Sequence, residues 1–76
     1  SFCVMAAQIC KGDNQTFASD AECMTACAAY NPVPAYDASK TSGDSFACRL
    51  YHLTSASNDP VTHCPHIGPV SAVCHP

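Results

Sequence analysis

Residues 45–64, SFACRLYHLTSASNDPVTHC, contain the strongest helix signals of the chain. Apolar side chains recur in this stretch at the three- to four-residue spacing of one helix face, at Phe46, Leu50 and Leu53. Asp44 or Ser45 can cap the first turn, because a side-chain oxygen there accepts a hydrogen bond from a free backbone amide. These signals predict a helix over residues 44–57.

Two shorter signals flank this helix. The Asp-Pro pair at 59–60 supplies a capping carboxylate and then a proline at the first helical position, which predicts a short turn over residues 60–64. Further upstream, Ser19 or Asp20 can cap a helix over residues 19–30. The chain therefore alternates helical and irregular segments.

The remaining segments lack a regular pattern. The first ten residues, SFCVMAAQIC, show neither strand alternation nor helical spacing, and they predict an extended or irregular segment. Residues 31–43, NPVPAYDASKTSG, combine two prolines, a glycine and small polar side chains, which is typical of a surface loop. We expect one domain over residues 1–76 that is mainly α with long irregular loops.

Cysteine is the most informative part of the composition. A chain of 76 residues buries too little surface to be stable without cross-links. The spacings between successive cysteines are 6, 12, 3, 20, 15 and 9 residues, with no short zinc knuckle among them. The composition therefore predicts a small disulfide-rich domain from an oxidising compartment. The candidate disulfide cysteines are Cys3, Cys10, Cys23, Cys27, Cys48, Cys64 and Cys74.

Seven cysteines cannot all pair within one chain, so one thiol is left over. This thiol can be buried, capped by a small molecule or bonded to a second chain, and the last is a serious candidate in a secreted protein. The composition is 47% apolar and only 12% charged, which also favours self-association. We therefore expect a homodimer, which a disulfide could link.

Several classes of partner are disfavoured. The three basic residues are scattered and the net charge is −3, which argues against nucleic acid. The longest apolar run is too short to span a bilayer. The chain opens without a charged segment followed by an apolar one, as expected of a mature secreted protein. Asn14 begins an Asn-Gln-Thr glycosylation sequon.

The histidines support two interpretations. They can satisfy hydrogen bonds in the folded chain, in which case no cofactor is expected, or they can bind copper or zinc, since neutral imidazole suits both ions. The candidate metal ligands are His52, His63, His66 and His75. No nucleophile elbow or phosphate loop is present, and no catalytic residue is predicted. Side chains expected on a binding surface are Tyr36, Arg49 and Tyr51.

Two segments of the chain resemble known families. Residues 46–74 are similar to the C-terminal part of uncharacterised secreted cysteine-rich proteins of fungi, which implies a fungal extracellular origin and no established activity. The signature C-R-x-Y-H, H-C-P-H, C is formed here by Cys48, Arg49, Tyr51, His52, His63, Cys64, Pro65, His66 and Cys74. Residues 10–27 resemble the last segment of a Kunitz protease inhibitor, but the chain lacks that family's two further upstream cysteines and its reactive loop.

The Kunitz-like segment implies a way to pin a helix with cysteines. By analogy with such scaffolds, Cys23 is expected to pair with Cys3 or Cys10, and Cys64 with Cys48 or Cys74.

The sequence thus predicts a secreted, non-enzymatic binding protein that associates with itself, with another secreted protein or with a surface ligand. The alternatives are a copper or zinc protein, a protease inhibitor and an accessory subunit of a larger secreted enzyme.

Overall fold

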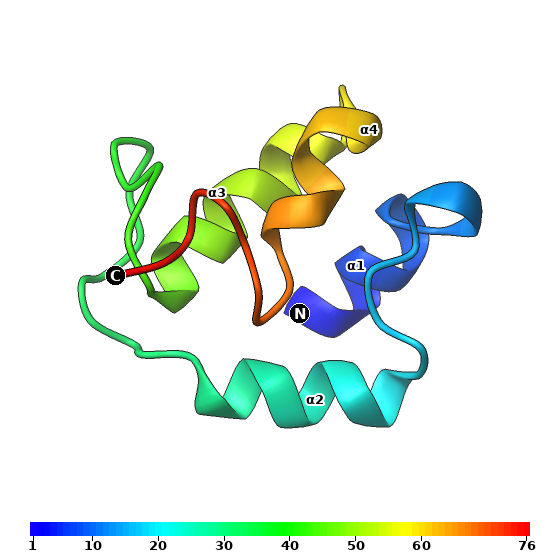
Figure 1. Cartoon of the computed structure of the whole chain (residues 1–76), viewed down its shortest axis with the longest axis horizontal. Helices are drawn as coiled ribbons and strands as arrows, with labels where there is room; N and C mark the ends of the chain where they lie inside the picture. Colours follow the sequence, from blue (N-terminus) through cyan, green and yellow to red (C-terminus); the bar gives the residue numbers. More distant parts are fainter.

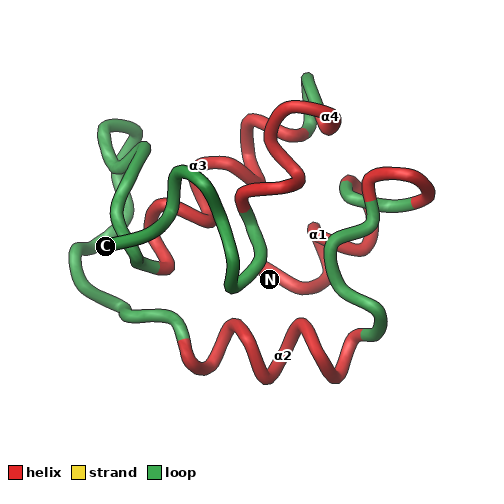
Figure 2. Tube along the Cα trace, in the orientation of Figure 1, coloured by secondary structure: helices red, strands yellow, loops and turns green.

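The computed structural model describes all 76 residues and is helical without any strand (Figures 1 and 2). The elements, in chain order, are α1 (Phe2–Ile9), η1 (Gly12–Asn14), α2 (Asp20–Ala29), α3 (Phe46–Ala56), α4 (Pro60–His63) and η2 (Cys64–His66), where η marks a 3₁₀ turn. In the view of Figure 1, α2 runs along the lower edge, with α3 and α4 above it. The prediction of a small disulfide-rich, mainly α fold is confirmed. None of the helices has the length and apolar character needed to cross a bilayer.

Three of the four α-helices begin at the caps that the sequence predicts. Ser19, Ser45 and Asp59 precede α2, α3 and α4, and in each case a side-chain oxygen accepts the amide proton three residues ahead. These caps are local interactions, which explains why the sequence predicts where the three helices start.

The first helix corrects the prediction for residues 1–10, because Phe2–Ile9 is α-helical and not extended. Phe2, Cys3 and Ala6 are buried on one side of α1, while Val4 is exposed. The helix has only eight residues, and two alanines and a cysteine are among them. These small side chains make the helical spacing of its apolar residues hard to recognise in the sequence. The position of α1 is fixed by disulfides to Cys23 and Cys64, which lie outside residues 1–10.

The disulfides connect α1 to the rest of the molecule. They are Cys3–Cys23, Cys10–Cys64 and Cys48–Cys74, and Cys27 is free. The pairing of Cys3 with Cys23 agrees with the prediction. The predicted partners of Cys64 are wrong, because α1 contacts α3 and brings Cys10 beside η2.

The hydrophobic core lies where α1, α2, α3 and η2 meet. Its buried members are Phe2, Cys3, Ala6, Cys10, Cys23, Tyr30, Leu53, Ala56, Cys64 and Ile67. The ring of Phe2 lies edge-on to Tyr30, with 6.2 Å between ring centroids, and 5.5 Å from the ring of Phe46. Because disulfide cysteines occupy four of these ten positions, the core depends on cross-links as much as on aliphatic packing.

Removing the cross-links should destabilise the protein in the order of the loops they close. Replacing Cys10 and Cys64 with alanine, across 54 residues, should lower the free energy of unfolding by about 4.2 kcal/mol. The Cys3/Cys23 pair, across 20 residues, should cost about 3.3 kcal/mol, because the loop-closure entropy of the unfolded chain is smaller.

Urea unfolding followed by circular dichroism measures both values. Cys27→Ala removes no cross-link within the chain, so it serves as the control and should lower the free energy of unfolding by about 1 kcal/mol or less. A Cys3/Cys23 loss larger than the Cys10/Cys64 loss would contradict the prediction.

Candidate functional site: a histidine cluster beside a buried arginine

The fold gathers three of the four histidines. His52 lies in the middle of α3, His63 at the end of α4 and His66 in η2, and the ring centroids of His63 and His66 are 5.3 and 5.1 Å from that of His52. His75 is exposed near the end of the chain, where its Nδ1 is 2.9 Å from the carbonyl oxygen of Pro76. We call His52, His63 and His66 the histidine cluster.

One proton joins His52 to His63. The Nε2 atom of His52 is 3.1 Å from the carbonyl oxygen of Thr41, and a carbonyl only accepts, so Nε2 carries the ring proton. In the neutral ring, Nδ1 of His52 then holds a lone pair. It lies 3.0 Å from Nδ1 of His63, which must donate its proton. One hydrogen bond between their Nδ1 atoms therefore joins the two rings.

The environment keeps His52 neutral. Its burial lowers its pKa below the usual value for histidine, because an imidazolium ion loses hydration inside the protein. The Thr41 carbonyl opposes this shift, while His66 and His63 add to it.

His66 is held in a different way. Its Nδ1 is 3.0 Å from Oγ of Ser71, and that oxygen accepts the amide protons of Val73 and Cys74 at 3.0 and 2.8 Å. These two bonds occupy both lone pairs of the hydroxyl oxygen, so the hydroxyl donates to His66. The neutral ring of His66 therefore carries its own proton on Nε2.

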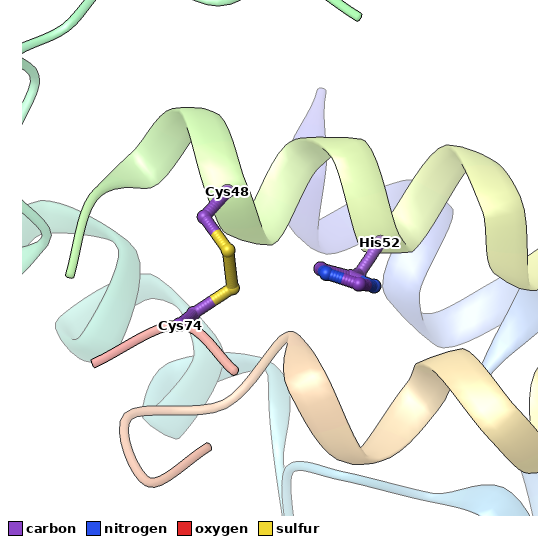
Figure 3. Close-up of side chains that lie close together, drawn as sticks. All are labelled: Cys48, His52 and Cys74. Atoms are coloured by element: carbon purple, nitrogen blue, oxygen red, sulfur yellow. A yellow bond between two sulfur atoms is a disulfide. The ribbon is translucent and has the colours of Figure 1, made fainter. Parts of the chain in front are cut away.

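His52 also lies next to a disulfide (Figure 3). The sulfur atoms of Cys48 and Cys74 and one ring nitrogen of His52 are all within 4.8 Å of one another, and all three residues are buried. Metal binding by cysteine requires a thiolate, and here the two sulfurs are bonded to each other. The Cys48–Cys74 disulfide therefore attaches the C-terminal segment to α3.

Arg49 lies on the same helix and is buried, with 1% of its surface exposed. It forms an ion pair with Asp44 at 2.9 Å, and its guanidinium carbon lies 4.2 Å from the centre of the Tyr30 ring. Its N–H groups also donate to the carbonyl oxygens of Ser45, Gly68, Pro69 and Cys74. The prediction that Arg49 belongs to a binding surface is wrong, because these contacts enclose it.

The other predicted surface residues differ in exposure. Tyr36 is 45% exposed in the loop after α2. Tyr51 is half-buried, with its ring edge-on to His52 at 5.0 Å between centroids. Asn14, the predicted glycosylation site, is partly exposed at the end of η1.

Tyr30 has a structural role that the sequence does not single out. Its hydroxyl donates to the carbonyl oxygen of Ile67 at 2.7 Å, and burial raises its pKa to about 12 although the charge of Arg49 opposes the shift. The residues near Tyr30 in the sequence do not predict this role. Ile67, 37 residues away, supplies the acceptor.

Comparison with known proteins gives one match. Residues 1–74 match the model of a family described as the BfoA family C-terminal domain. No curated protein and no solved structure matches the chain.

Arg49→Lys should lower the free energy of unfolding by about 2 kcal/mol, because an ammonium group cannot reach all of the buried carbonyls and leaves some without a donor. Urea unfolding measures the loss. Lys40→Ala removes the more exposed Asp37–Lys40 pair, whose nitrogen and oxygen are 3.8 Å apart, and should cost much less than Arg49→Lys, because solvent screens an exposed ion pair. Equal losses in the two variants would contradict the structural role of Arg49.

Proposed function

This chain belongs to the BfoA C-terminal domain family, and we propose from its own residues that it is a secreted, non-enzymatic interaction protein that associates with itself. Three disulfides in 76 residues support an extracellular location, because the cytosol keeps such thiols reduced. The fungal source in this proposal rests on the sequence signature of residues 46–74 alone. The partly exposed sequon at Asn14 supports glycosylation in the secretory pathway.

The hydrogen bonds of the charged and titratable side chains support the proposal that the protein is not an enzyme. The guanidinium of Arg49 is directed at backbone carbonyls, and His52 and His66 are hydrogen-bonded to a carbonyl and a hydroxyl. The carboxylates of Asp37 and Asp59 accept backbone amide protons two and three residues ahead. These groups maintain the fold, and none of them is paired with an activated nucleophile.

The observation that carries the proposal is the exposure of apolar side chains on a chain with few charges. Large apolar residues between 45% and 91% exposed are Val4, Met24, Val33, Tyr36, Val61 and Val70. Covering such side chains with a partner removes apolar surface from water and is favourable.

Helix α2 offers the best contact for a second copy. Met24 is 58% exposed, and Ala21 and Ala28, one turn before and after it, are also exposed. We call these three residues the α2 outer face, and Figure 1 shows α2 at the edge of the molecule. The free thiol of Cys27 is partly exposed beside this face. When two copies pair their α2 outer faces about a two-fold axis, only the residues next to that axis lie opposite their own copies. We place the axis beside Cys27, so that the two thiols can be oxidised to a disulfide in an oxidising compartment.

Sedimentation velocity and non-reducing electrophoresis test this arrangement. The wild-type protein should sediment as a dimer, part of it covalent, and Cys27→Ala should abolish the covalent part but keep the non-covalent dimer. Met24→Lys should yield a monomer, because it places a charge in the apolar contact.

Val61→Lys is the matched control, since Val61 is 72% exposed on α4, outside the α2 outer face. It should leave the dimer intact. A wild-type protein that stays monomeric at all concentrations would refute self-association, and dissociation by Val61→Lys alone would move the contact away from α2.

A further inference from the structure

We propose that His52 and His63 form a copper(II) site, in which the Nδ1 atoms of both rings bind one ion and solvent completes the coordination. Copper(II) accepts imidazole nitrogen at adjacent positions of a square or tetragonal arrangement. The site narrows the metal-binding alternative suggested by the sequence to two ligands and one ion. It does not depend on self-association, because neither histidine belongs to the α2 outer face.

His52 is already arranged as a ligand. The hydrogen bond from its Nε2 to the Thr41 carbonyl, at 3.1 Å, fixes the tautomer and the ring orientation. It leaves the lone pair of Nδ1 facing His63. Histidines that bind metals nearly always donate their second nitrogen to an acceptor of this kind. The environment of His52 therefore supplies the supporting contact that a ligand needs.

His63 provides the second nitrogen and the freedom to adjust. It is partly exposed at the end of α4, so its ring has room to turn and solvent reaches part of the side chain. When its Nδ1 binds the ion, the proton now on that atom moves through solvent to Nε2. The ring then carries its proton on Nε2.

The type of ligand indicates which ion this site favours. Imidazole nitrogens bind copper(II) more tightly than zinc(II) and the other divalent ions of the first transition series, and copper(II) accepts them at adjacent positions. The two Nδ1 atoms now lie at hydrogen-bond distance, 3.0 Å, so a small movement of His63 brings both to one ion. The Nδ1 lone pair of His52 now accepts the proton on Nδ1 of His63, so the ring of His63 must lose that proton and turn before both nitrogens can bind one ion.

The other two histidines are outside the proposed site. The Nδ1 atom of His66 already accepts from the Ser71 hydroxyl, and its Nε2 carries a proton. His75 is exposed and contacts only its neighbour Pro76 among hydrogen-bonding groups. The proposal therefore makes His63 essential, His66 secondary and His75 unnecessary, an order that the sequence does not predict.

Titration with copper(II) at pH 7.4, with the disulfides intact, tests the order. We expect one ion per chain, and the electron paramagnetic resonance spectrum should show coupling to two imidazole nitrogens. His63→Gln should weaken binding by about 100-fold or more, since loss of a group that only supports a ligand already costs about 10- to 100-fold. His66→Gln should weaken binding less than tenfold.

His75→Gln is the matched control and should bind copper as tightly as the wild-type protein. Circular dichroism and the non-reducing mass of each variant establish that the fold and disulfides are intact. Because a folding defect could hide the effect in a His52 variant, the deciding variant is that of the partly exposed His63. Coupling to a single nitrogen, equal affinity of His63→Gln and wild type, or an equal loss in His75→Gln would overturn the proposal.

Discussion

The buried guanidinium of Arg49 is the interaction on which the C-terminal half of the structure depends. A charge with 1% exposure is costly unless its hydrogen bonds are satisfied, and here four carbonyl oxygens and the carboxylate of Asp44 satisfy it. Three of those carbonyls belong to residues 68–74, a segment that forms no helix or strand. The side chain therefore supplies the donors that regular secondary structure normally provides.

The position of the histidine cluster follows from this network. Arg49 and His52 lie one turn apart on α3, with Cys48 beside them, so one side of the helix receives a guanidinium, an imidazole and a disulfide. The guanidinium and the disulfide both hold Cys74, and Ser71 accepts the Cys74 amide and donates to His66. The orientation of His66 thus depends on contacts that begin at Arg49.

The sequence predicts what is local and misses what is long-range. Ser19, Ser45 and Asp59 act on amides three residues ahead, and the helices they start are predicted correctly. The Cys10–Cys64 bond spans 54 residues, and no local pattern indicates it. For Arg49, the sequence shows a charge and one nearby acid, but its burial arises from carbonyls 19 to 25 residues away. The histidines are recognisable as a group, yet their tautomers depend on Thr41 and Ser71, which nothing in the sequence singles out.

The two hydrogen bonds of the His52 ring, to His63 and to Thr41, connect three segments of the chain. A buried imidazole is tolerated only when both nitrogens have partners, and for His52 those partners lie in the loop before α3 and at the end of α4. Leucine at this position would fill the space without coupling the segments. Copper(II) bound to both Nδ1 atoms would leave the hydrogen bond from His52 to Thr41 in place, and His63 would be the residue that moves. The rigid side of the site is therefore α3 with its loop, and α4 is the side that adjusts.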